Sequence, residues 1–173
     1  MTEFITDRQI YEKVIKTLVP DTNRFLWIGT ADIKDMYVEK GKQMIPFLSV
    51  LDDLIRKKAQ IRLIHAKEPG SVFKKEFDRF PLLWKSMERI CCPRVHFKII
   101  VIDGKWAYTG SANLTGAGMG AKSNARHNFE NGILTNDSTL VEQIMQQFDT
   151  IWMGTPCKYC GRKQYCVDRI DRV

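Results

Sequence analysis

The segment Val95–Asp103 is the sequence feature that most limits the fold. Both the odd-numbered and the even-numbered residues of this segment are apolar, apart from His96, Lys98 and Asp103. This pattern is typical of a strand at the centre of a sheet that is covered on both faces. The chain of 173 residues is long enough for one domain that buries such a strand, and it is too short for two full-sized domains.

Apolar runs of strand length alternate with segments of helical periodicity along the rest of the chain. Further strands are predicted at 25–30, 61–66, 106–109 and 130–135. Helices are predicted at 10–18, after Pro46, over most of 72–90 and after a cap at 137–139, where Thr139 and Glu142 fit a capping box. Because residues 95–109 look like a hairpin, we predict a mixed, mostly parallel α/β sheet flanked by helices on both faces.

The composition changes after Gly154, where a basic tail rich in cysteine begins. We therefore predict a main domain at 1–153 and a short tail at 154–173. The N-terminus lacks the basic start and apolar run of a secretory signal, and no segment approaches the ~20 apolar residues of a membrane span. We expect a cytoplasmic protein with reduced thiols and no stable membrane association.

The charge balance points to an anionic partner. Lys and Arg number 27 and Asp and Glu number 20, which gives a formal net charge of +7. Such an excess favours nucleic acid or an acidic membrane surface as a partner.

His96 and Lys98 are two residues apart on the predicted strand, so their side chains should point to the same face. Burying an imidazole beside an ammonium is costly unless an anion lies between them. The ammonium would attract a phosphate, and the imidazole could act as a nucleophile or as a general acid–base. Asp103 is an odd number of residues from His96 and Lys98, so its side chain should point to the opposite face of the strand. It should act through salt bridges or backbone hydrogen bonds. A strand end with a solvated His and Lys is the alternative.

The pattern His-x-Lys-x4-Asp-x6-Gly-Ser-x-Asn resembles the HKD signature of the phospholipase D superfamily. The match is complete at every specified position, namely His96, Lys98, Asp103, Gly110, Ser111 and Asn113. The resemblance covers roughly residues 5–153. The segment His127–Asn131 also resembles the small nuclease branch of the superfamily, in which a Glu hydrogen-bonds the catalytic His, and Glu130 would take that role.

The resemblance implies a mechanism and, in the main domain, a catalytic function. His96 would attack the phosphodiester phosphorus and form a phosphohistidine. A second HKD histidine would protonate the leaving oxygen, and water would then release the enzyme. Lys98 and Asn113 would hold the non-bridging oxygens with help from Ser111, and Glu130 would fix the tautomer of His96. No cofactor is needed for this chemistry.

One motif is present, whereas this mechanism uses two histidines. The resemblance implies a two-fold homodimer in which both motifs meet at the axis, as in the small one-motif members. The alternative is that His127 supplies the acid within one chain. A catalytic role for His65, at the end of a predicted strand, is the weaker option because such a histidine is more often part of the core.

The cysteines form a separate signal. Cys157, Cys160 and Cys166 fit Cys-x2-Cys-Gly with a later third Cys, and a glycine after the second Cys is typical of a zinc knuckle. A closed site needs a fourth ligand. Cys91, or its neighbour Cys92, could supply it if the helix predicted before the motif strand lies beside the C-terminus. We predict a structural Zn²⁺. An iron–sulfur cluster and a reduced tail without metal are the alternatives.

These features together predict a homodimeric, metal-independent phosphodiesterase, an endonuclease acting on DNA or RNA. The loop 115–126 carries Lys122 and Arg126 beside Asn113 and is predicted at the substrate mouth. A phospholipase D-type lipid phosphodiesterase is one alternative. A catalytically silent nucleic-acid-binding module is the other.

Overall fold

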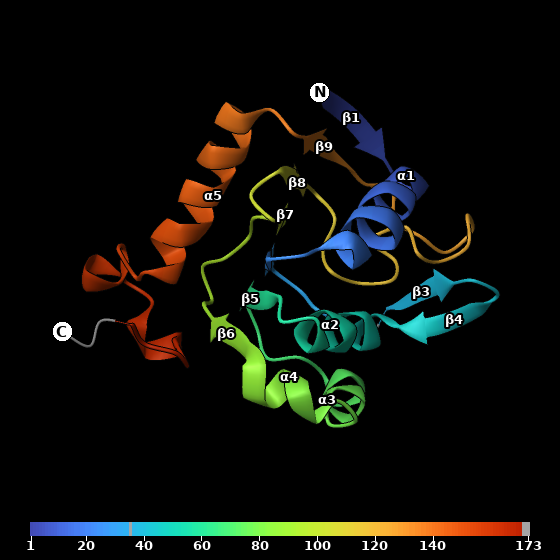
Figure 1. Ribbon diagram of the computed structural model, residues 1–173. Coiled ribbons are helices and arrows are strands. Elements are labelled where there is room, and N and C mark those ends of the chain that lie inside the picture. The colour runs from blue at the N-terminus through green and yellow to red at the C-terminus, as the bar shows by residue number, and fades with distance from the viewer. Residues whose placement is uncertain (35, 171–173) are drawn as a thin grey trace.

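A computed structural model describes residues 1–34 and 36–170. In these residues one mixed sheet has the strand order β1-β9-β8-β7-β2-β5-β6 (Figure 1). Its strands are β1 (Thr2–Thr6), β2 (Phe25–Thr30), β5 (Gln60–His65), β6 (Met87–Cys91), β7 (Ile99–Ile102), β8 (Trp106–Gly110) and β9 (Asn131–Thr135). A separate hairpin of β3 (Tyr37–Lys40) and β4 (Gln43–Pro46) projects from the main body.

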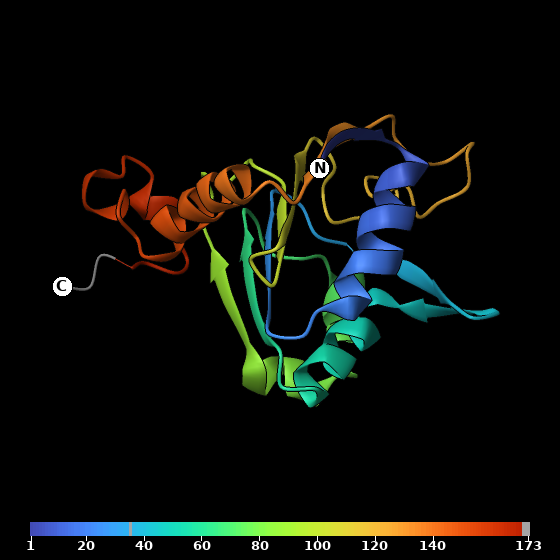
Figure 2. The same cartoon turned by 45° about the horizontal axis from the view of Figure 1, so that its top comes forward.

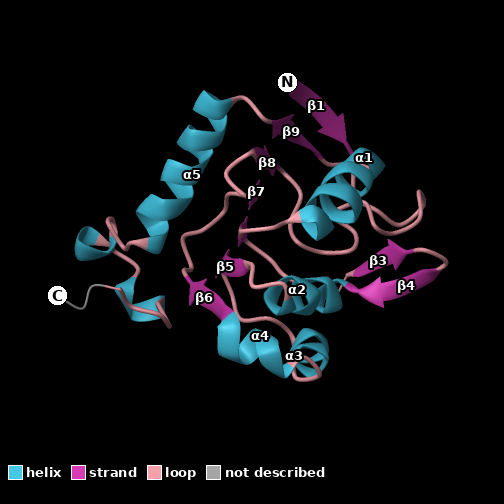
Figure 3. Cartoon of the chain, in the orientation of Figure 1, coloured by secondary structure: helices cyan, strands magenta, loops and turns pink. Residues whose placement is uncertain are grey.

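Helices cover both faces of the sheet (Figures 2 and 3). One side carries α1 (Arg8–Ile10), which continues as the π-helical η1 (Tyr11–Leu18) and the turn η2 (Val19–Asp21), together with α2 (Phe47–Arg56). The other side carries α5 (Ser138–Trp152). The shorter α3 (Ser71–Phe77) and α4 (Pro81–Ser86) lie between β5 and β6 in the chain. None of the described helices combines the length and apolar composition needed to cross a membrane.

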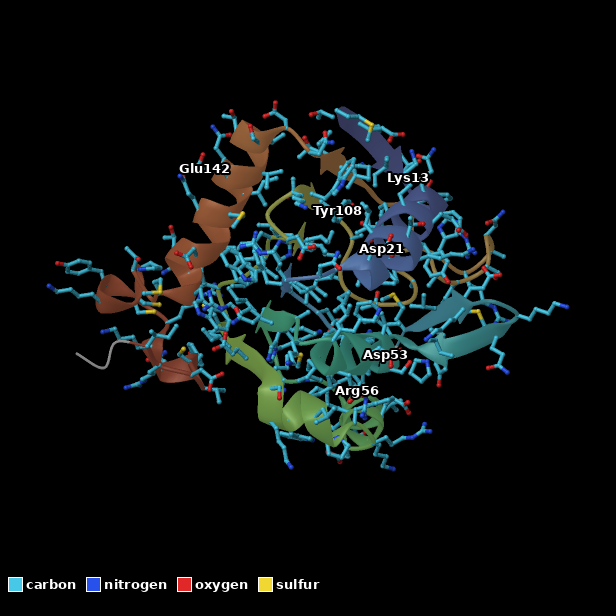
Figure 4. The ribbon with its side chains drawn as sticks, viewed as in Figure 1. Lys13, Asp21, Asp53, Arg56, Tyr108 and Glu142 are labelled. Atoms are coloured by element: carbon cyan, nitrogen blue, oxygen red, sulfur yellow. The ribbon has the colours of Figure 1, made fainter. Side chains whose placement is uncertain are left out.

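Strand β7 lies at the middle of the sheet, and all four of its residues are buried. Ile100 and Ile102 join the core on the α1 and α2 side, whereas Ile99 and Val101 join the core beneath α5. Tyr108 of the neighbouring β8 is fully buried in the first of these cores (Figure 4). The predicted central strand with two covered faces is therefore confirmed.

The mixed α/β sheet with helices on both faces is confirmed, but its balance differs from the prediction. Only β2–β5 and β5–β6 are parallel, and the other four neighbouring pairs are antiparallel. The β7–β8 hairpin is extended on its outer side by antiparallel β9, which follows the long loop 111–130, and by antiparallel β1 from the N-terminus.

Two local predictions need correction. The segment 72–90 is mostly helical, as α3 and α4 with a break before Pro81, but it ends in strand β6, where Met87 pairs with Ile61 at the edge of the sheet. The last helix begins after Asp137, whose side chain accepts a hydrogen bond of 2.9 Å from the Leu140 backbone N–H. An aspartate at this position satisfies a free helical donor, so the capping box predicted at Thr139 is wrong.

Asp103 ties the end of β7 to the start of β2. It lies with Gly104 in a tight turn at positive φ (56° and 66°) that leads into β8. Its Oδ1 accepts hydrogen bonds from the backbone N–H groups of Arg24 (2.7 Å) and Phe25 (3.0 Å), and its Oδ2 accepts one from Asn23 (3.0 Å). Burial raises the pKa of Asp103, but these three backbone hydrogen bonds outweigh it and hold the pKa below the ordinary aspartate value.

Replacing Asp103 by Ala should lower the free energy of unfolding by about 2–4 kcal/mol, because three backbone donors lose their acceptor and alanine disfavours positive φ. Asp103→Asn is the matched control, since asparagine tolerates positive φ and keeps one acceptor oxygen. Urea unfolding should rank the proteins wild type, Asn, Ala in decreasing stability. Equal stability of Asp103→Ala and wild type would contradict this role.

The same carboxylate makes stability depend on pH. Because its pKa is lower in the folded chain than in the unfolded chain, its contribution is complete above the ordinary aspartate pKa of about 4. It is lost as the pH falls through the lowered folded value. The stability difference between wild type and Asp103→Asn should therefore shrink as unfolding is measured at progressively lower pH below about 4.

Candidate active site

The ends of four neighbouring strands, β2, β7, β8 and β9, lie together at one end of the sheet. Ile99, the first residue of β7, pairs with Gly29 of β2 and with Thr109 of β8. Gly110, the last residue of β8, pairs with Gly132 of β9. The motif residues that precede β7 or follow β8 therefore lie side by side, and the segment that precedes β9 lies next to them.

His96 and Lys98 are in contact at this end of the sheet, just before β7. The Lys98 ammonium lies 3.3 Å from His96 Nδ1 and donates a hydrogen bond of 2.6 Å to the His96 carbonyl oxygen. Strand β7 begins at Ile99 rather than at Val95, but Gly110 N–H donates to the Lys98 carbonyl oxygen at 3.2 Å and extends the pairing. His96 is exposed, whereas Lys98 is 5% exposed.

The electrostatic environment of Lys98 suits an anion. Burial lowers the pKa of the Lys98 ammonium, and the nearby Glu130 carboxylate opposes that shift. A bound phosphate would add negative charge beside this ammonium and favour its charged form. The side chain is thus placed as a charge clamp next to the exposed imidazole of His96.

Ser111 and Glu130 form a second pair. The Ser111 hydroxyl donates to Glu130 Oε2 and accepts a hydrogen bond of 3.1 Å from the Asn131 backbone N–H. Asn128 Nδ2 donates to Glu130 Oε1 at 3.2 Å. Among the described residues no hydrogen bond joins Glu130 to His96, so the contact that the family resemblance implied is not present within one chain. Glu130 instead orients Ser111.

Asn113 is held by the end of β2. Its Oδ1 accepts hydrogen bonds from the Asp32 backbone N–H (3.1 Å) and from the Thr30 hydroxyl (3.4 Å). Thr30 is fully buried, and its hydroxyl also accepts from the Leu114 backbone N–H at 3.0 Å. Because Oδ1 accepts these bonds, the Nδ2 end carries the donors that an anionic oxygen needs.

A groove of about 400 Å³ opens beside Asn113. Lys34 lines it from the segment after β2, Lys122 lines it from the loop after β8, and Tyr37 of the hairpin forms part of its wall. Of the two basic residues of the loop 115–126, Lys122 lines this groove and Arg126 does not. The groove places two cations near the motif.

The other histidines are engaged elsewhere. His65 is fully buried, its Nδ1 lies 2.8 Å from the Lys67 carbonyl oxygen, and burial lowers its pKa. His127 Nδ1 lies 2.7 Å from the Asn128 carbonyl oxygen, and its ring packs edge-on against Phe129. In the described part of the chain, neither has a recorded hydrogen bond to His96.

The cysteines divide into two sets. Cys91 is buried at the end of β6, and burial raises the pKa of its thiol to about 11. The other cysteines, which are Cys92, Cys157, Cys160 and Cys166, line one small cavity of about 20 Å³. Cys91 is not a lining residue, whereas Cys92, the other candidate for a fourth metal ligand, is one. Within residues 1–34 and 36–170, no three His, Cys, Asp or Glu side chains are arranged to hold a metal ion.

Comparisons with known proteins define the family. A family model described as "Cardiolipin synthase, PLD-like domain" matches residues 24–152. The chain therefore belongs to the phospholipase D-like family, as the HKD pattern predicted, and at family level it is a phospholipase D-superfamily phosphodiesterase. A search of curated protein sequences finds no match to this chain.

Solved structures share the fold at low sequence identity. NucT from Helicobacter pylori is 10% identical, with a TM-score of 0.64 over 88% of this chain and 95% of that chain. The phospholipase D family member Nuc from Salmonella typhimurium is 12% identical, with a TM-score of 0.62 over the same shares. The archaeal chromatin protein TrmBL2 is 12% identical, with a TM-score of 0.53 over 87% of this chain and 51% of that chain. These likenesses support the fold.

Packing behind the motif gives a test of the site's geometry. A methyl group at Gly29 would lie 2.2 Å from the ring of Phe97, the residue between His96 and Lys98. Gly29→Ala should therefore lower the free energy of unfolding by about 1–3 kcal/mol, because the ring must move.

Gly70→Ala is the control, since nothing lies within 4 Å of its added methyl group and its φ is −65°. Its stability should stay within about 0.5 kcal/mol of wild type in the same urea titration. If the two variants are equally stable, Phe97 does not pack over Gly29 as described.

Proposed function

We propose that this chain is a metal-independent endonuclease that hydrolyses nucleic acid through a phosphohistidine on His96, at a site shared across a homodimer. The observation that carries the proposal is the contact between the exposed His96 and the buried Lys98, while Asn113 of the same motif lines a groove together with Lys34 and Lys122. This arrangement offers a nucleophile and a fixed positive charge to one phosphodiester.

The proposed reaction has two displacements at phosphorus. A ring nitrogen of His96 attacks the phosphorus, a P–N bond forms, and the bond to the leaving oxygen breaks. The imidazole of the second copy gives its proton to that oxygen. Water then attacks the phosphorus and passes a proton to the same imidazole, and the P–N bond breaks. Both imidazoles are restored, and the product is a phosphate monoester.

The other motif residues would stabilise the charge that develops on phosphorus. Lys98 supplies a cation whose position is fixed by burial, and Asn113 supplies the amide donors opposite the Oδ1 held by Asp32. Preorganised donors of this kind need little rearrangement as the charge builds up. Ser111, held by Glu130, would assist them.

Several observations favour nucleic acid as the substrate. The net charge is +7, and Lys34 and Lys122 line the groove next to Asn113. TrmBL2 is a chromatin protein with a described mode of DNA binding, and that likeness also supports the binding-module alternative. The name of the family model, cardiolipin synthase, keeps a lipid phosphodiester as the other alternative. Reduced cysteines in the tail would suit the cytoplasm as its location.

Two features support a shared site. The described chain offers His96 no second histidine partner, whereas the proposed route needs one to protonate the leaving oxygen. Phe129, next to Glu130, has 91% of its surface exposed, and a large apolar side chain in this position gains by being covered by a second copy. A two-fold axis near the motif would meet both requirements.

Cleavage of labelled single- and double-stranded DNA and RNA in EDTA tests the activity. Wild type should cleave single strands best, since they enter a narrow two-fold cleft more readily, and circular dichroism in the same buffer should show an intact fold. His96→Asn should lose at least about a thousandfold in turnover yet keep its affinity, because only the attacking nitrogen is removed. Affinity should fall steeply with salt as lysines release counterions.

Binding of nucleic acid by wild type without any cleavage would favour the binding module. Hydrolysis of a phosphatidylcholine analogue without cleavage of any nucleic acid would favour the lipid alternative. Wild-type rates in His96→Asn would contradict the assignment of the nucleophile.

Coexpression of wild-type and His96→Asn chains tests the shared site. With equal amounts and random pairing, about a quarter of the dimers contain two wild-type chains. Total activity should therefore follow the square of the wild-type fraction. A linear dependence, as expected if His127 supplied the acid within one chain, would contradict sharing, and sedimentation shows whether dimers form.

A further inference from the structure

Two distant segments bring four cysteines to one cavity. Cys92 follows strand β6, whereas Cys157, Cys160 and Cys166 belong to the tail after α5. All four line the same cavity of about 20 Å³. Figure 4 shows sulfur atoms within the C-terminal segment, which lies beside the end of β6 in both Figure 1 and Figure 2.

The tail has the local geometry of a metal-binding turn. Residues Cys157–Tyr159 form a 3-10 turn in which the Cys160 backbone N–H donates to the Cys157 carbonyl oxygen at 3.1 Å. The Arg162 backbone N–H donates to Cys160 Sγ at 3.4 Å. Backbone donors that point at sulfur stabilise a thiolate, and this turn therefore prepares the Cys160 sulfur as a ligand.

Direct contacts hold the tail against the segment that contains Cys92. Asp168 Oδ2 accepts a hydrogen bond of 2.8 Å from the Cys91 backbone N–H, and the Asp168 carbonyl oxygen lies 3.3 Å from Cys166 Sγ. Arg162 Nη1 lies 3.5 Å from the Pro93 carbonyl oxygen. The two segments are thus already docked, and the sulfur atoms would have to move towards one another to hold an ion.

We propose that Cys92, Cys157, Cys160 and Cys166 form a structural zinc site that locks the tail onto the end of β6. Each thiol loses a proton on binding, and the resulting Zn–S₄ centre carries two negative charges. Arg94, Arg162, Lys163 and Arg169 also line the cavity and would balance that charge. The sulfur atoms would draw together around the ion to Zn–S distances of about 2.3 Å.

A zinc site here would also affect the space beside His96. A larger adjoining cavity of about 360 Å³ is lined by His96 together with the same four cysteines. Zinc would therefore fix the wall of the space next to His96. The proposal itself rests on the cysteines and stands whether or not the chain is a nuclease.

Adjacent cysteines provide a matched test. Cys92→Ala removes a proposed ligand, whereas Cys91→Ala removes a buried thiol that does not line the cavity. Each full-length protein is purified with Zn²⁺ supplied, dialysed and analysed for metal. Wild type and Cys91→Ala should each contain about one zinc per chain, and Cys92→Ala should have lost it. Equal zinc in the two variants, or wild type that takes up no zinc, would overturn the site.

Thiol protection in wild type gives a second readout that needs no variant. The protein is alkylated with and without added Zn²⁺, and the modified cysteines are mapped by mass spectrometry. Zinc should protect Cys92, Cys157, Cys160 and Cys166 together, while alkylation of Cys91 should not change. Alkylation of the tail cysteines that zinc leaves unchanged would overturn the proposal even if Cys92→Ala fails to fold.

Discussion

The burial of strand β7 on both faces is the constraint on which the rest of the structure depends. Because Ile99–Ile102 are covered by α1 and α2 on one side and by α5 on the other, polar chemistry is confined to the two ends of the strand. At the C-terminal end of β7, Asp103 accepts hydrogen bonds from the backbone at the start of β2. His96 and Lys98 occupy the other end, where β2 and β8 end and β9 begins.

The Lys98 ammonium is buried at this end of the sheet, and burial makes its charge costly. Lys98 is 5% exposed, and its burial disfavours the charged form unless negative charge is near. Glu130 supplies part of that charge, but its carboxylate is already bonded by Ser111 and Asn128. A phosphodiester held by Lys98 and Asn113 would supply the remainder next to the exposed imidazole of His96. The same groups that bind the anion would thus be in position to stabilise its transition state.

The elements with strong periodicity could be predicted from the sequence, because their burial follows directly from the order of apolar residues. Strand β7 and helix α2 are of this kind, whereas the HKD positions are identified by their resemblance to a family signature. The sequence does not predict strand β1 or the β3–β4 hairpin, since β1 is an edge strand with one residue fully buried, Ile5, and the hairpin is mostly exposed. Strand β6 was taken for helix because its edge position depends on pairing with β5. The orientation of Glu130 towards Ser111, and of Cys92 rather than Cys91 towards the tail, depends on tertiary packing that periodicity does not encode.

The central claim is that phosphorus is transferred to His96 and then to water, and the stereochemical course at phosphorus tests it most directly. Each in-line displacement inverts the configuration at phosphorus. An oligonucleotide with one phosphorothioate of known configuration, cleaved in isotopically labelled water, should therefore give a product with net retention, because two inversions cancel. Net inversion would show a single attack by water and would contradict the phosphohistidine route.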